Sequence, residues 1–285
     1  MSPVVDAHFH IWRLARADYG WLTPALGAIH RDIDVAAWER VAAPCGVGRG
    51  VLVQAAPTAA ETRFLLDQAE AHAAVAGVVG WTDLLASDAP ARIAALARHP
   101  KLKGVRPMLH DLADPDWILQ AALAPALQAM TDLGLVFDAL VRPVHLPRIL
   151  ELARRHPALR IVLDHAAKPP IAAGHWQPWA DDLRRLAGET NVQCKLSGLL
   201  TESGTASLAP WVDHVFACFG PERVIWGSDW PVLELAGDYK HWWTLAHELS
   251  SSLDPAQRHA VFGANAARVY RLDGTAHERV QPGSV

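Results

Sequence analysis

The chain has 285 residues, of which 51% are hydrophobic and 20% charged, and its formal net charge is −4. This composition is typical of a globular protein with ample material for a core, and the acidic balance argues against nucleic acid or an anionic membrane as a partner. No apolar run approaches membrane-spanning length, and Asp6 and His8 stand where a secretory signal needs an apolar core.

The three cysteines, Cys45, Cys194 and Cys218, are widely spaced and form no Cys-x-x-Cys motif. An odd number of separate thiols indicates a reduced protein, so we expect a cytoplasmic location. No Gly/Ser linker, charge block or low-complexity stretch marks a boundary. We therefore expect a single domain over residues 1–285, with a peripheral tail from about residue 273.

The first predicted strand, residues 4–10, ends in a His-x-His pair. Because alternate side chains of a strand share a face, His8 and His10 should project the same way. Two adjacent imidazoles can bind one metal ion, or a carbonyl oxygen and a proton. The alternative is an ordinary half-exposed strand that happens to carry two histidines.

Apolar, β-rich runs then alternate with segments of helical periodicity along the whole chain. The further strands are predicted over 50–55, 77–83, 103–108, 135–141, 160–165, 191–197 and 223–229. Helices are predicted over 60–75, 89–99, 115–133, 146–156 and 178–189. Eight near-continuous apolar strands separated by helices predict an α/β protein with a (β/α)8 TIM-type barrel. An open doubly wound sheet is the competitor, but no G-x-G-x-x-G follows the first strand.

Polar groups end nearly every predicted strand, where a barrel places its catalytic residues. They include His8, His10, Gln54, Trp81, Asp83, Arg106, Asp138, Arg142, Asp164, His165, Lys195, Ser197, Ser228 and Asp229. A single buried polar residue is often structural, but each of so many would need its own partner, so their convergence favours an active site. Twelve tryptophans add aromatic faces that suit a sugar ring, and most must be packing residues. Those near candidate site positions are Trp12, Trp21, Trp81, Trp226, Trp230, Trp242 and Trp243, of which Trp21, Trp81 and Trp230 are the expected ligand contacts.

Several motifs together resemble one known family. They are Asp6–His10, Asp18–Leu22, Leu102–Arg106, Leu163–His165 with Lys168-Pro169, Cys194–Leu199, Trp226–Pro231 and Phe262–Tyr270. The set, which spans residues 4 to about 272, resembles the amidohydrolase superfamily, in the branch of the sugar lactonases and 2-pyrone-4,6-dicarboxylate lactonase. The resemblance implies hydrolysis of a sugar lactone such as L-fuconolactone or L-rhamnonolactone.

Lactone hydrolysis needs an activated water, help at the carbonyl, and a proton for the departing alkoxide. Asp229 is the expected general base, which would return its proton to the leaving oxygen; the alternative is a cap for the turn that follows. His8, His10 and His165 would either hold a divalent ion together with Asp229 or donate hydrogen bonds to the oxyanion. Two-metal members of the superfamily carry a lysine or glutamate on strand four and a histidine on strand five. This chain has Arg106 and Asp138 there, so we expect one Zn²⁺ or no metal.

The remaining strand-end residues are expected to contact the substrate. Arg106 and Lys195 would bind the carbonyl or the hydroxyls, although Arg106 could equally form an ion pair with Asp83 or Asp138. The other expected contacts are Gln54, Trp21, Trp81, Asp138 and Trp230. A dicarboxylate would require several converging arginines, so this mixture favours a neutral polyhydroxylated ring. Three alternatives remain, a metal-dependent decarboxylase of the same branch, an amide or other ester hydrolase, and a non-catalytic sugar-binding barrel; a homo-oligomer also remains open.

Overall fold

The computed structural model describes residues 3–272; the tail expected to be peripheral from about residue 273 lies outside them. Within this range, eight parallel strands follow one another around a single sheet in chain order. The strands are β1 (Val5–Phe9), β2 (Arg49–Val53), β3 (Val75–Gly80), β4 (Leu102–Val105), β5 (Val136–Ala139), β6 (Arg160–Leu163), β7 (Val192–Leu196) and β8 (Val224–Trp226).

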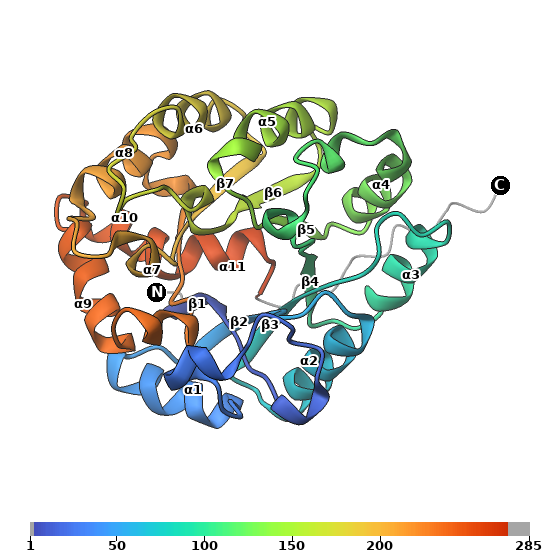
Figure 1. Cartoon of the computed structure of the whole chain (residues 1–285), viewed down its shortest axis with the longest axis horizontal. Helices are drawn as coiled ribbons and strands as arrows, with labels where there is room; N and C mark the ends of the chain where they lie inside the picture. The colour runs from blue at the N-terminus through green and yellow to red at the C-terminus, as the bar shows by residue number, and fades with distance from the viewer. Residues whose placement is uncertain (1–2, 273–285) are drawn as a thin grey trace.

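The sheet closes where β8 returns to β1. A parallel bridge joins Phe9 to Trp230, and the Asp229 amide donates to the His8 carbonyl at 2.7 Å. With helices in the connections between strands, this is the predicted (β/α)8 barrel, and Figure 1 shows the helices as a ring around it. Between residues 3 and 272, no helix is both long enough and apolar enough to cross a bilayer.

The helices occupy the expected connections. They are α1 (Val35–Ala42), α2 (Ala59–Ala71), α3 (Ala89–Leu96), α4 (Ala124–Asp132), α5 (Leu146–Arg155), α6 (Trp179–Ala187), α7 (Leu200–Ser203), α8 (Ala209–Phe219), α9 (Tyr239–Leu249), α10 (Pro255–His259) and α11 (Asn265–Val269). The predicted helix over 115–133 is wrong in its first half, which forms two 3-10 turns. Pro125 explains the late start of α4, because proline fits the first turn of a helix but disrupts its interior.

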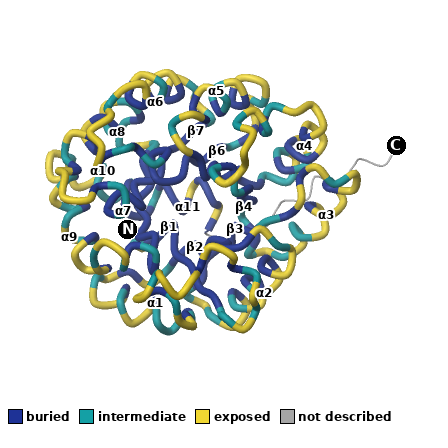
Figure 2. The backbone as a smooth tube through the Cα atoms, viewed as in Figure 1, coloured by how far each residue is buried: buried dark blue, intermediate teal, exposed yellow. Residues whose placement is uncertain are grey.

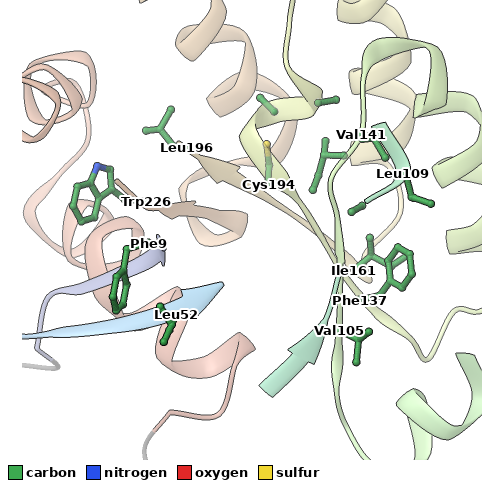
Figure 3. Packing of buried hydrophobic residues seen from close by; sticks show 14 of the residues in the cluster. Phe9, Leu52, Val105, Leu109, Phe137, Val141, Ile161, Cys194, Leu196 and Trp226 are labelled. Carbon is green, nitrogen blue, oxygen red and sulfur yellow. The ribbon is translucent and has the colours of Figure 1, made fainter. Parts of the chain in front are cut away.

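Two apolar layers pack the barrel. Outside the strands, residues such as Phe9, Phe137, Ile161 and Trp226 fill the space beneath the helices (Figure 3). Figure 2 shows the result, with buried strands inside and exposed outer helix faces. Inside the barrel, a second cluster joins the strands to α11, which lies across the centre of the ring in Figure 1. Its members include Val5, Ala7, Val51, Val53, Val79, Val136, Val162, Ile225, Ala266, Val269 and Tyr270.

A β-bulge in β1 decides which way its polar side chains point. Asp6 pairs with Gly50 and Phe9 with Leu52, so β1 carries one extra residue between these pairs. As a result, Asp6 turns towards the helices and accepts hydrogen bonds from Trp38 of α1 and Tyr239 of α9. It also accepts from the Ser228 amide and hydroxyl, at 2.8 and 2.6 Å, which fastens β8 to β1.

Candidate active site

Three histidines and one carboxylate meet where β1, β6 and β8 end. His8 and His10 place their Nε2 atoms 3.1 Å apart, as the His-x-His spacing predicts. The Asp229 Oδ1 atom lies 3.7 Å from His8 Nε2, 3.4 Å from His10 Nε2 and 3.8 Å from His165 Nε2. All four side chains are buried. Residues at the carboxyl ends of β1, β6 and β8 thus build one centre.

The surroundings fix the orientation of two of these rings. His10 Nδ1 lies 2.8 Å from the Val53 carbonyl, which can only accept, so Nδ1 donates to it and Nε2 faces Asp229. His165 Nδ1 lies 2.8 Å from the Ser197 hydroxyl, which leaves its Nε2 facing Asp229. Burial lowers the pKa of His165 to about 4, so this ring is neutral near pH 7.

Asp229 stays ionised although it is buried. Burial opposes ionisation, but His165, His10 and His8 outweigh it and hold the pKa of Asp229 below its ordinary value. Its backbone is left-handed, with φ 59°, a conformation that Asp tolerates better than most residues. Gly227 allows the segment after β8 to lie close to β1, because a Cβ at this position would lie only 2.8 Å from His8 Cβ.

A buried chain of charges lies beside His8. Arg106 donates to Asp164 at 3.1 Å, Lys195 Nζ lies 3.0 Å from Asp164 and donates to Asp138 at 2.6 Å, and the Tyr270 hydroxyl donates to Asp138. Burial raises the pKa of Asp138 to about 6. For Asp164, Lys195, His8 and Arg106 outweigh burial, and its pKa lies well below the ordinary value.

This arrangement corrects the ion pair expected for Arg106. Its partner is Asp164, which directly follows β6, rather than Asp138 or Asp83. Asp138 is taken by Lys195, and Asp83 is exposed and accepts from the Leu85 amide. The polar residues at the strand ends predicted these charged side chains, but they did not predict which of them form ion pairs.

A cavity of about 190 Å³ opens onto the centre. It is lined by His10, Trp21, Ala55, Arg106, Met108, His110, Asp111, Leu140, His165, Lys168, Asp229 and Val232. Trp21 is held over it by a 2.7 Å hydrogen bond from its Nε1 to the Ala55 carbonyl. The expected site residues His10, His165, Asp229, Arg106 and Trp21 thus line the same cavity, with His8 buried beside them.

The family model for amidohydrolases matches residues 5–272, which is nearly all of the described chain. The chain belongs to the amidohydrolase family. It is 50% identical over 281 residues to an L-fucono-1,5-lactonase of Burkholderia ambifaria, covering 96% of this chain and 97% of that protein. An L-fucono-1,5-lactonase of Burkholderia multivorans is 36% identical, over 97% of this chain and 98% of its own.

A solved amidohydrolase structure from Burkholderia multivorans, with bound zinc, superposes with a TM-score of 0.90. It is 36% identical, and the match covers 95% of this chain and 99% of that one. The barrel and its connections are therefore shared over almost the full length of both proteins.

Five residues expected to contact substrate do not line the cavity of this amidohydrolase. Lys195 and Asp138 are fully buried in the ion chain, and Gln54 donates to the Arg106 carbonyl from a fully buried position. Trp230 is buried and donates from Nε1 to Glu234, and the backbone of Trp81 is held by the Thr62 hydroxyl. Contact of these five residues with a ligand therefore stays a prediction, since none of them lines this cavity.

Sequence reasoning missed seven residues of the cavity wall, Ala55, Met108, His110, Asp111, Leu140, Lys168 and Val232. Three of them, Met108, His110 and Asp111, follow β4 in or just before the short 3-10 turn Leu109–Asp111, where no periodic pattern gives the direction of a side chain. Lys168 stood in a recognised motif, but its place three residues after His165 gave no sign that both face the cavity.

The donor set at this centre fits one divalent cation. Ligand atoms of His8, His10 and Asp229 lie within 4.8 Å of one another, and two imidazole nitrogens with a carboxylate oxygen suit zinc. His8, Asp164 and His165 form a second such group. There, however, the Lys195 ammonium already lies 3.0 Å from Asp164 Oδ1 and 3.2 Å from His8 Nδ1. The Lys195 ammonium thus occupies the place that a metal ion would take in the second group.

Proposed function

We propose that this amidohydrolase hydrolyses the ring ester of a sugar lactone, with L-fucono-1,5-lactone as the first candidate, to give the open sugar acid. The observation that carries the proposal is the buried, ionised Asp229 among three histidines on the wall of a cavity of about 190 Å³. The 50% identity with an L-fucono-1,5-lactonase supports the choice of substrate.

We propose that His8, His10 and Asp229 hold one zinc ion, with His165 as the next nearest donor. A bound zinc ion would polarise the lactone carbonyl and lower the pKa of water. The orientation of His10, whose Nδ1 donates to the Val53 carbonyl and whose Nε2 faces Asp229, supports this assignment, as does the zinc in the related Burkholderia multivorans structure.

Asp229 takes a proton from the attacking water as the water oxygen bonds to the carbonyl carbon. The bond between that carbon and the ring oxygen then breaks, and Asp229 returns the proton to the ring oxygen, which leaves as a hydroxyl group. Arg106 Nη1 lies 3.3 Å from His8 Nε2, so it can donate to the carbonyl oxygen as negative charge develops there. The carboxylic acid formed loses its proton to solvent near pH 7, and Asp229 then repels the resulting anion, which favours its release.

The charges of the cavity wall favour a neutral substrate over a dicarboxylate. Among the described residues, Arg106 is paired with Asp164, and Lys168 donates to Glu202 at 2.9 Å. Burial lowers the pKa of His110 to about 4, so it adds no positive charge near pH 7. A second carboxylate on the substrate would therefore find no surplus cation here.

The test is acid release, followed with a pH indicator, from sugar lactones of defined configuration, corrected for spontaneous hydrolysis. Zinc content is measured on the same preparation, before and after chelation and after zinc is restored. We expect rapid release from one stereochemical series, loss on chelation and recovery with zinc. No release from any lactone by the zinc-loaded protein would overturn the proposed activity, and full activity without metal would overturn the proposed zinc site.

A further inference from the structure

The segment that follows β6 has an uncommon backbone. His165, Ala166, Ala167 and Lys168 are consecutive, none is glycine, and their φ angles are 54°, 49°, 63° and 51°. Left-handed backbone is unfavourable for a residue with a side chain, because its Cβ then lies too close to the following carbonyl oxygen. Such strain persists only where the surrounding structure fixes it, and it gathers at functional sites.

The surroundings do fix this turn. The Lys168 amide donates to the His165 carbonyl at 2.8 Å, and the Trp179 indole of α6 donates to the Ala166 carbonyl at 2.8 Å. Both alanines are fully buried. Gly198 is required on the other side, because a Cβ there would lie 2.5 Å from His165 Nδ1.

The geometry of the turn explains what it achieves. In a 3-10 turn, the side chains at positions i and i+3 lie on the same face. His165 and Lys168 are three residues apart, and both line the cavity. The left-handed turn therefore delivers a second functional group to the wall that already holds His165, while its two middle residues stay small.

Lys168 is well suited to bind hydroxyl groups. Its ammonium has three N–H donors, and among the described contacts Glu202 of α7 takes one of them, at 2.9 Å. The Glu202 carboxylate thus orients the ammonium and balances its charge. Lys168 lines the same cavity as His165 and His110, so its ammonium can reach a ligand bound beside the reaction centre.

We propose that Lys168, positioned by Glu202, donates hydrogen bonds to the hydroxyl groups of the bound lactone and so selects polyhydroxylated rings over unsubstituted ones. The inference rests on the proposed lactonase activity. A site built to bond a hydroxyl discriminates strongly against a substrate that lacks it, because its donors are then left unpaired.

The experiment compares kcat/KM for a sugar lactone with that for unsubstituted δ-valerolactone in the wild-type protein, Lys168→Met and Lys240→Met. Met keeps the length of the Lys side chain but removes the donors, and Lys240 is an exposed lysine of α9 that serves as the matched control. We expect Lys168→Met to lower kcat/KM for the sugar lactone 10- to 100-fold, chiefly through KM, and to leave δ-valerolactone within about threefold. Lys240→Met should match the wild type on both substrates.

Glu202→Gln keeps an acceptor for Lys168 but removes the charge, so a smaller rise in KM for the sugar lactone is expected. Melting temperature and zinc content confirm that each variant is folded and loaded. Equal losses on both lactones, or no loss on either, would overturn the role of Lys168. If the wild-type protein hydrolyses neither lactone, the proposed function itself fails.

Discussion

At the base of the barrel, the interior is filled by apolar side chains such as Val51, Val162 and Ile225, which pack against α11. At the carboxyl ends of the same strands, the interior holds ionised groups, among them Asp164 and Lys195, with almost no exposure. The base needs only apolar side chains of fitting shape, whereas each group at the mouth requires a specific partner because burying a lone charge is costly.

At the mouth of the barrel, the buried carboxylates of the ion chain each face a cation, whereas Asp229 does not. The buried charges of the ion chain and the reaction centre are two cations and three carboxylates, namely Arg106, Lys195, Asp138, Asp164 and Asp229. The carboxylates of the ion chain are matched by the two cations. Asp229 faces histidines instead, and His165 among them is neutral near pH 7. One negative charge is therefore left at the reaction centre, where a cation would balance it.

The largest effect should come from removing that charge. We expect Asp229→Asn to lower kcat on a sugar lactone by roughly a thousandfold, because it removes the base, and to lower bound zinc as well. Steady-state kinetics and metal analysis measure both effects. Asp83→Asn, which changes an exposed carboxylate outside the cavity, is the control. A rate for Asp229→Asn within tenfold of the wild-type rate would rule out this base.

The next largest effect concerns the ion chain. Lys195→Met leaves Asp138 and Asp164 without their shared cation, so we expect a loss of about 3–5 kcal/mol in the free energy of unfolding, measured with denaturant. Adding Asp138→Asn removes one of the stranded charges and should recover part of this loss. A loss below about 1 kcal/mol in the single variant would mean that the chain adds little to stability.

A carboxyl beside the mouth gives a pH-dependent test. Glu61 is buried, accepts from the Tyr19 hydroxyl at 2.7 Å and from the Ala55 amide at 3.1 Å, and burial raises its pKa from 4.5 to about 7. The fold thus favours the protonated form, so its contribution to stability falls as the pH rises from about 4.5 to 7, by roughly 3 kcal/mol at most.

Glu61→Gln should flatten the dependence of the unfolding free energy on pH in this window, while the exposed Glu39→Gln should follow the wild-type curve. Denaturant melts at several pH values measure the difference. Parallel curves for Glu61→Gln and the wild type would show that Glu61 titrates normally.

The smallest effect concerns the left-handed turn. Ala167→Gly and Ala153→Gly both remove a buried methyl group, but Ala167 has φ 63° and Ala153 lies within α5. Glycine relieves the strain at the first position and lowers helix propensity at the second. We expect Ala167→Gly to be the more stable variant by about 1–2 kcal/mol. Equal unfolding free energies would show that the turn stores little strain.

The sequence was enough to predict the barrel and its reaction centre, because both follow from local patterns. Eight apolar runs predicted the strands, and polar residues at their ends predicted the centre that His8, His10, His165 and Asp229 form. These patterns depend on strand alternation and on the shared direction of parallel strands, which are properties of the backbone.

The pairing of charges and the cavity wall could not be predicted in this way. That Arg106 pairs with Asp164 depends on the reach of two side chains from β4 and β6, which are separated by β5. That Lys168 faces the cavity depends on four residues in a conformation that no propensity favours. Both are decided by tertiary contacts, such as the Trp179 hydrogen bond to Ala166, between residues far apart in the sequence.

The closure of the barrel has a consequence for biosynthesis. The Ser228–Asp6 contacts that fasten β8 to β1 join residues 222 positions apart. A ribosome that adds about 5–20 residues per second needs roughly 10–45 s to pass from one to the other. During that time the nascent chain presents His8 and His10 without Asp229, so the complete reaction centre can assemble only after β8 has emerged.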